Sequence, residues 1–327
     1  MYDMTSFGKI RVEGKDACKF LNYICGNDVD TPVGKITYTQ FLNERAGIEA
    51  DVTVTRLGEE SYIVVTPAAT VQRELHWMNK YKQDFNVILM DMTSAEGVLA
   101  VMGPNARKLL EKVSPNHDWT NENHPFGQAH DIELGMGLAR AHRVTYVGEL
   151  GWELYVPTDM AAHAFETLHE AGQDLDLKLC GMHMMDSLRI EKAFRHFGHD
   201  ISGEDHVLEA GLGFAPRKTS LGRDAVLKKK EEGLSMRLVQ FKLKEPEPLL
   251  YHNEPVVRDG EIVSYVTSAN YGHTLGGAIG LGYVPSKGET AAQMLESSYE
   301  IEIAGERFQA EASMKPMYDP KSERVKV

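Results

Sequence analysis

Residues 146–155 constrain the fold of this chain more than any other stretch. They run Tyr-Val-Gly-Glu-Leu-Gly-Trp-Glu-Leu-Tyr, which predicts the end of one strand, a tight glycine turn and a second strand. Glu153 lies between Trp152 and Leu154, so its side chain leaves the sheet on the face opposite theirs. If that face is buried, the carboxylate needs a partner with several N–H donors; otherwise Glu153 is a solvated residue on the outside of a hairpin.

The elements around this hairpin predict two antiparallel α+β units followed by an all-β domain. Short alternating strands with turn residues begin at about residue 235 and indicate either a barrel or a jelly roll. We therefore predict domains at 1–92, 93–205 and 206–327, with the connector at about 203–234. The predicted strands are 8–14, 35–43, 47–57, 60–66 and 97–102, then strands near 130–147 and a strand at 150–156. The predicted helices begin at Ala17, at Thr66–Pro67 with a capping hydroxyl, and at 103, 159 and 181.

Composition excludes several classes of function. The 327 residues carry a formal charge of −13 and no basic stripe interleaved with aromatic residues, which argues against nucleic acid as a partner. Three cysteines, none in a CxxC pair, are typical of a reducing compartment and give no metal framework. Because no apolar run approaches 18 residues and the first residues do not have the shape of a signal peptide, we expect a cytoplasmic protein with no membrane contact.

Asp51 is the second carboxylate of interest. It lies in a predicted strand of mostly β-branched residues, where aspartate is disfavoured, so something must compensate for it. Asp51 either faces water or is held beside a reacting amine, which it orients or deprotonates. Tyr38, thirteen residues earlier on the neighbouring strand, is expected to share that surface.

Other motifs argue against built-in cofactors. The glycine clusters at 211–213 and 272–282 do not form GxGxxG after a strand, so we expect no flavin or nucleotide site within this chain. His196 and His199 lack a third ligand nearby, and we expect no metal. Five cations are available to an anionic ligand tail, although an acidic protein also carries such residues on its surface: Lys192, Arg195, Arg217, Lys218 and Arg223.

Taken together, several stretches resemble the folate-binding aminomethyltransferase (glycine cleavage T-protein) family, and within it the C-terminal folate domain of dimethylglycine and sarcosine dehydrogenases. The order and spacing of these stretches along about 320 residues make the resemblance specific. They are residues 4–9, 32–35 continuing to 51–54, 103–107, 146–153, 186–195, 208–212 and 221–223.

The resemblance implies a cloverleaf of two ferredoxin-like α+β domains and a β-barrel or jelly-roll domain around a central hole that holds tetrahydrofolate. In that family the carboxylate matching Glu153 recognises the N–H edge of the pterin, with the tyrosine matching Tyr146 beside it. The aspartate matching Asp51 lies near the reactive N5, and the positions matching Tyr38, Val65 and Phe194 line the pterin slot.

The resemblance also implies the reaction. Oxidation of an N-methyl amine of the dimethylglycine or sarcosine type gives an iminium carbon, which the folate captures to give 5,10-methylene-tetrahydrofolate. Two alternatives stay open: a folate-dependent demethylase or methyltransferase that uses another methyl donor, and a non-catalytic folate-binding regulatory protein. The Lys-Gly-Cys and Gly-Gln-Glu stretches of the iron–sulfur-assembly members are missing here, which counts against the second.

Three departures from the family pattern qualify the resemblance. Met185 stands where glycine-cleavage T-proteins carry an arginine, which argues against a role in glycine cleavage itself. The loop at 216–220 is shorter than usual, which affects contacts with the ligand tail. Because the chain opens at what would be an internal strand, we expect either a separate FAD-dependent dehydrogenase chain that supplies the missing segment or a stand-alone remnant.

Overall fold

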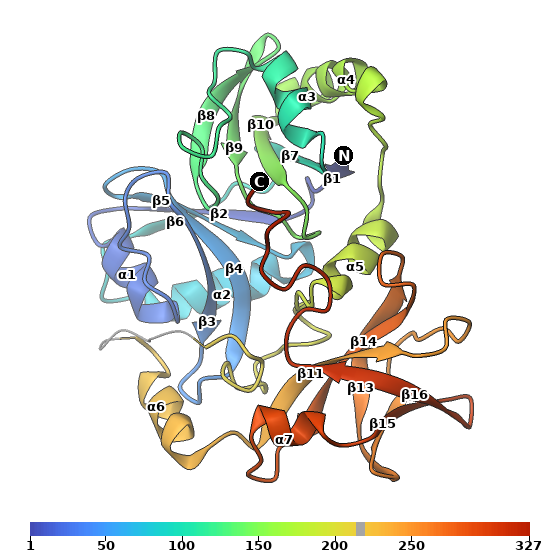
Figure 1. Cartoon of the computed structure of the whole chain (residues 1–327). Helices are drawn as coiled ribbons and strands as arrows, with labels where there is room; N and C mark the ends of the chain where they lie inside the picture. The colour runs from blue at the N-terminus through green and yellow to red at the C-terminus, as the bar shows by residue number, and fades with distance from the viewer. Residues whose placement is uncertain (214–219) are drawn as a thin grey trace.

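The computed structural model describes residues 1–213 and 220–327. In this part of the chain it has three lobes (Figure 1). Two are antiparallel five-stranded sheets with helices packed on one face, and the third is a closed six-stranded barrel. The predicted fold class of two antiparallel α+β units and a C-terminal β-barrel is confirmed, and the barrel replaces the jelly-roll alternative.

The first lobe has the strand order β3-β4-β5-β2-β6. Its strands alternate, and one face packs apolar side chains such as Val52, Val54 and Val64 against two helices in a common core. The other face of the sheet is the inner face. It carries two pairs of register partners, Tyr38 with Thr53 and Gln40 with Asp51. The elements are β2 (Gly8–Glu13), α1 (Ala17–Ile24), β3 (Ile36–Leu42), β4 (Ile48–Arg56), β5 (Ser61–Thr66), α2 (Val71–Tyr81) and β6 (Ile88–Asp91).

The start of α2 differs from the prediction. Pro67 has an extended ψ of 143°, so the chain continues through a single 3-10 turn at Ala68–Thr70 and the α-helix begins only at Val71. No side-chain hydroxyl caps this helix. The prediction of a capped helix start at Thr66–Pro67 is wrong because the proline at the first turn begins the 3-10 turn instead.

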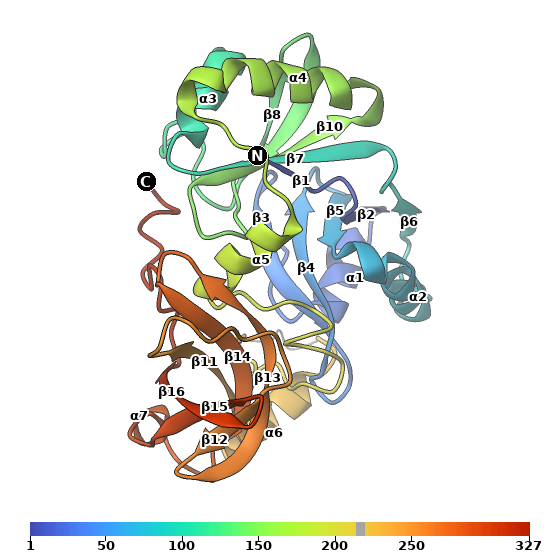
Figure 2. The ribbon, with the colours of Figure 1, turned by 90° about the vertical axis from the view of Figure 1, so that its right-hand side faces the viewer.

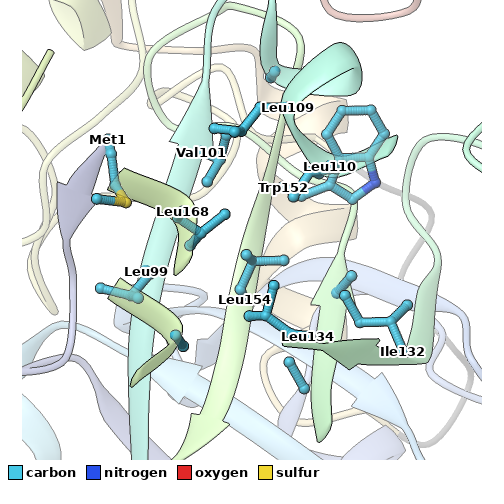
Figure 3. Close-up of a cluster of buried hydrophobic side chains, with 14 of the residues drawn as sticks. Met1, Leu99, Val101, Leu109, Leu110, Ile132, Leu134, Trp152, Leu154 and Leu168 are labelled. Atoms are coloured by element: carbon cyan, nitrogen blue, oxygen red, sulfur yellow. The ribbon is translucent and has the colours of Figure 1, made fainter. Parts of the chain in front are cut away.

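The second lobe has the strand order β1-β7-β10-β9-β8. Its outer face packs on two helices, and Trp152, Leu154 and Leu168 lie in that core (Figure 3). The first strand of the chain, β1, pairs with β7 and so joins this second sheet. The domain boundaries 1–92, 93–205 and 206–327 stay predictions. The elements are β1 (Tyr2–Asp3), β7 (Glu96–Met102), α3 (Ala106–Val113), β8 (Ala129–Leu134), β9 (Gly137–His142), β10 (Gly151–Pro157) and α4 (Ala161–Ala171).

The third lobe is the barrel, closed in the order β11-β14-β13-β12-β15-β16. Helix α5 (Met182–Glu191) lies between the second sheet and the barrel, as Figure 2 shows. After the barrel, the last residues run back to the second lobe (Figure 1). The remaining elements are α6 (Arg223–Glu232), β11 (Met236–Leu243), β12 (Pro255–Arg258), β13 (Glu261–Gly272), β14 (Gly277–Pro285), α7 (Ala291–Leu295), β15 (Tyr299–Ile303) and β16 (Glu306–Ser313).

The inner faces of the two sheets meet in a separate apolar cluster. Ile63 and Val65 of the first sheet pack there with Val98 and Tyr155 of the second, and Met185 of α5 joins them. Burial of this mixed cluster, with residues from both sheets and from α5, fixes the two sheets relative to each other. The inner faces are therefore where residues far apart in the sequence come together.

Asp200 ties the α5 region to the barrel. Its carboxylate, fully buried, accepts from Arg189 Nη1 at 2.8 Å, and Ser268 Oγ of β13 donates to it at 2.6 Å. We expect Asp200→Ala to lower the free energy of unfolding by roughly 3–5 kcal/mol, because it leaves the Arg189 charge buried without this partner. Urea unfolding measures the change. Asp224→Ala, at a side chain 97% exposed, is the control and should stay within about 0.5 kcal/mol of wild type; a comparable loss in both variants would contradict the assignment.

Candidate functional site

Asp51 lies on the inner face of β4 and is held by a neighbour across the strand pair. Gln40 is directly opposite in register, and its Nε2 donates to Asp51 Oδ1 at 2.6 Å. Burial raises the pKa of Asp51 to about 6, although the bonds from Gln40 and Tyr38 and the charge of Arg195 oppose that rise. Gln40 is therefore the compensating group that an aspartate in this strand requires. The residue as a whole is half-buried, and the pKa of its carboxyl is close enough to neutral for it to act as a base.

Tyr38 shares the inner face with Asp51, as the strand spacing predicts. It is two residues from Gln40 on β3, and Thr53 is its register partner. Burial, followed by the negative charge of Asp51, raises the pKa of the Tyr38 phenol, so the hydroxyl stays protonated and can donate. Yet the residue as a whole is 44% exposed. An aromatic side chain with this exposure offers a flat surface to a ligand.

Glu153 lies on the inner face of β10. Trp152 and Leu154 point into the outer core (Figure 3), so the prediction that Glu153 leaves the sheet on the opposite face is confirmed. The residue is 9% exposed, which excludes the solvated-hairpin interpretation. Among the described residues its hydrogen-bond partner is Tyr155, whose Oη donates to Glu153 Oε2 at 2.8 Å. Burial raises the pKa of Glu153 to about 7, and the bond from Tyr155 opposes that rise.

Tyr146 lies in a loop, not at the end of a strand as predicted. Strand β9 ends at His142, and residues 143–150 connect it to β10. The predicted glycine turn is present at Gly148, whose φ is +75° and whose Cβ, if added, would lie 2.2 Å from the Lys192 side chain. A side chain at position 148 would therefore clash with Lys192, which favours glycine at this turn.

The rings of Tyr146 and Phe194 come together although they are 48 positions apart. Their centroids are 6.2 Å apart and their planes differ by 14°. Tyr146 Oη donates to the Arg195 carbonyl at 3.0 Å, which fixes the loop against the chain that follows α5. Burial raises the pKa of the Tyr146 phenol, and the negative charge of Asp51 contributes to that rise.

These contacts connect the predicted site residues. Tyr38, Asp51 and Tyr146 interact electrostatically. Val65, 8% exposed, packs in the same apolar cluster as Tyr146 and Tyr155, and Tyr155 in turn holds Glu153. The two carboxylates thus lie on facing sheets, joined by an aromatic and apolar surface.

The five cations proposed as partners for an anionic ligand tail differ in their contacts. Arg195 donates to the carbonyls of Ala193 and Ala210, both at 3.0 Å, and its charge acts on Asp51. Lys192, 1% exposed, donates to the Asp319 carbonyl at 2.6 Å and so anchors the C-terminal segment. Arg223 pairs with Asp224. Arg217 and Lys218, with residues 216–219 of the predicted short loop, lie outside the described residues.

Comparison with protein families decides the family. Residues 1–220 match the model of the GCVT N-terminal domain, and residues 237–319 match the glycine cleavage T-protein C-terminal barrel domain. The chain belongs to the glycine cleavage T-protein family. This is a folate-binding family of the aminomethyltransferase type, as the sequence resemblance indicates.

Relatives within the family differ in length. The 4-methylaminobutanoate oxidase (formaldehyde-forming) of Paenarthrobacter nicotinovorans is 40% identical over 100% of this chain and 39% of its own length. The mitochondrial sarcosine dehydrogenase of Mus musculus is 34% identical over 100% of this chain and 38% of its own length. An aminomethyltransferase of Halothermothrix orenii is 36% identical over 87% of this chain and 79% of its own length. The chain thus spans about two fifths of the first two relatives.

A solved structure agrees with this assignment. The crystal structure of the glycine cleavage system aminomethyltransferase T from Bartonella henselae superposes with a TM-score of 0.85 at 26% identity, covering 98% of this chain and 86% of that one. The glycine cleavage T-protein fold therefore extends over all three lobes. In the described part of the chain, no helix is both long and apolar enough to cross a bilayer.

Reasoning from the sequence missed two residues of the candidate site. Gln40 holds Asp51, and Tyr155 holds Glu153. A signal was present for both, because each lies two residues from a predicted site residue within an alternating strand and so shares its face. Tyr155 even falls within the stretch that predicts the hairpin, but an aromatic residue at a strand end is equally typical of a core.

Proposed function

We propose that this chain is a tetrahydrofolate-dependent one-carbon transferase. It captures the carbon of an oxidised N-methyl amine, of the dimethylglycine or sarcosine type, as 5,10-methylene-tetrahydrofolate. The observation that carries the proposal is Glu153, a nearly buried carboxylate with acceptor capacity to spare, on an inner sheet face next to aromatic rings. Family membership and relatives named for N-methyl amine substrates support it.

The residues on the inner faces fit a reduced pterin. One Glu153 oxygen accepts from Tyr155, and among the described residues no donor bonds to the other, which suits adjacent ring N–H donors. The near-parallel rings of Tyr146 and Phe194 and the exposed ring of Tyr38 suit a flat heterocycle. Val65 adds apolar contact. These residues would hold tetrahydrofolate.

The chemistry divides between ligand and protein. When bound, tetrahydrofolate supplies the N5 amine that bonds to the iminium carbon and the N10 amine that displaces the donor amine. Asp51 takes the proton from N5, and its negative charge stabilises the cationic one-carbon unit. Gln40 keeps the Asp51 carboxylate in position. The protein's main contribution is to hold the reactants in place.

Oxidation of the N-methyl amine needs a two-electron acceptor. We propose that a flavin-dependent dehydrogenase chain supplies it, since two relatives named as an oxidase and a dehydrogenase are much longer than this chain. The iminium carbon then passes to the inner faces of the two sheets. In this scheme the present chain carries out only the transfer half of the reaction.

The test is calorimetry with tetrahydrofolate, followed by turnover of N-methylglycines with and without a flavoprotein dehydrogenase. We expect binding to this chain alone, and 5,10-methylene-tetrahydrofolate only with the flavoprotein. A methyl-folate product would indicate a different donor, and binding without turnover would indicate a non-catalytic folate-binding protein. No binding would refute the proposal.

Folate affinity should depend on pH through Glu153. Its pKa of about 7 in the free protein means that the side chain is increasingly protonated below that pH, and a protonated carboxyl accepts poorly from ring N–H groups. We expect the association constant to rise with pH up to about 7 and then level off, falling toward tenfold per pH unit on the acid side. Calorimetry from pH 5.5 to 8.5 measures it. The same slope in Glu153→Gln would assign it to another group.

A further inference from the structure

His142, the last residue of β9, is a buried polar side chain that the proposed mechanism does not use. The residue is 1% exposed. Among residues 1–213 and 220–327, neither of its ring nitrogens has a hydrogen-bond partner. Buried polar groups in native proteins are nearly always paired, so an imidazole with two unpaired nitrogens needs an explanation.

His142 lies directly beside Glu153. The two residues are register partners in the antiparallel pair of β9 and β10, so their side chains leave the same face as close neighbours. The centroids of the His142 and Tyr155 rings are also 4.2 Å apart, and Tyr155 is the residue whose hydroxyl donates to Glu153. An imidazole, a phenol and a carboxylate thus form one cluster on the inner face of the second sheet.

The imidazole is neutral in this setting. Burial, followed by the positive charge of Arg140, holds the pKa of His142 well below its usual range. A neutral imidazole carries one N–H donor and one acceptor nitrogen. His142 therefore brings to the cluster a donor that neither carboxylate oxygen of Glu153 can provide.

This donor matches the edge that Glu153 is proposed to recognise. A 2-amino-4-oxo-pyrimidine edge presents two adjacent donors, the ring N3–H and the 2-amino group, and a carboxylate pairs with both. The positions that flank those donors, the 4-oxygen and N1, are both acceptors. A residue beside the carboxylate can bond to a flanking position only as a donor, which a neutral histidine is.

We propose that His142 is a specificity-determining residue that donates a hydrogen bond to an acceptor flanking the two donors that Glu153 binds. Together, His142 and Glu153 recognise the acceptor–donor–donor–acceptor pattern along the edge of a 2-amino-4-oxo-pyrimidine ring. The inference rests on the proposed folate site. It extends that site by one residue and one kind of recognition, since Glu153 alone does not sense the flanking acceptors.

Calorimetry with tetrahydrofolate on His142→Phe and His142→Asn tests the affinity. We expect His142→Phe to bind roughly 3- to 10-fold more weakly than wild type, the usual effect of one hydrogen bond, and His142→Asn, which keeps a side-chain donor, to recover part of the loss. The matched control is His130→Phe. His130 is the register partner of Ala141 on the neighbouring strand, so it lies on the opposite face, and its replacement should leave affinity within twofold.

A spectroscopic measurement on unaltered protein guards against misfolded variants. With 15N-labelled histidine, we expect tetrahydrofolate to shift the His142 ring nitrogens and to protect its N–H from exchange. Equal affinity in wild type and His142→Phe, or a His142 resonance that tetrahydrofolate leaves unchanged, would overturn the inference. Failure of wild-type protein to bind tetrahydrofolate would instead refute the proposed function, so the two failures are distinguishable.

Discussion

Asp51→Asn is expected to lower the rate of one-carbon transfer roughly 10²- to 10⁴-fold while tetrahydrofolate affinity stays within about threefold of wild type. The amide has the same shape as the carboxylate, and its oxygen still accepts the bond that Gln40 Nε2 donates to Asp51 at 2.6 Å. Local structure should therefore persist. What is lost is the negative charge and the basic oxygen that takes the N5 proton.

Two measurements on the same protein separate chemistry from binding. Calorimetry gives the affinity, and the rate of 5,10-methylene-tetrahydrofolate formation at saturating folate gives the transfer step. Asp224→Asn, at a side chain that is 97% exposed, is the matched control and should change neither. If Asp51→Asn loses affinity and rate together, Asp51 is a binding or folding residue and the catalytic assignment fails.

Glu153→Ala is expected to weaken tetrahydrofolate binding by roughly 2–5 kcal/mol, which is about 30- to 5,000-fold. The carboxylate is 9% exposed, so a ligand N–H group that pairs with it does so with little competition from water. After truncation those N–H groups would be buried against a methyl group. Calorimetry at pH 8, above the Glu153 pKa of about 7, measures the loss with the carboxylate ionised.

The choice of variants matters for Glu153 because its removal also affects the protein. Glu153→Ala leaves the Tyr155 hydroxyl without the acceptor it now has at 2.8 Å, whereas Glu153→Gln retains an acceptor and loses only the charge. We expect both variants to bind weakly and Glu153→Gln to unfold close to wild type. Glu166→Ala on the exposed face of α4 is the control. Unchanged affinity in Glu153→Gln would remove Glu153 from the pterin site.

The sequence was sufficient for the features that depend on local periodicity. A period of two along β10 predicts that Glu153 and Trp152 leave opposite faces, and the structure has them so. The same period along β3 and β4 places Tyr38 on the surface that carries Asp51. Fold class followed from the order of such segments, because antiparallel units with covering helices have few arrangements.

The sequence was insufficient where a contact depends on long-range packing. The sequence predicts a strand end at Tyr146, whereas strand β9 ends at His142 and the Tyr146 ring packs beside Phe194, 48 positions away. The predicted capped start at Thr66–Pro67 is wrong for a local reason, since the chain after Pro67 first makes a 3-10 turn. The position of Tyr146 could not be predicted from local propensity, because tertiary contacts outweigh propensities of less than about 1 kcal/mol per residue.

The sequence by itself determined which carboxylates face away from their apolar neighbours, since that is a property of the strand period. Only the tertiary structure decided what those carboxylates meet. Gln40 reaches Asp51, and His142 lies beside Glu153 with its nitrogens unpaired, because the register of neighbouring strands brings them there, whereas Tyr155 reaches Glu153 from two residues along the same strand. Burial then sets their pKa values, and burial is a property of the whole fold.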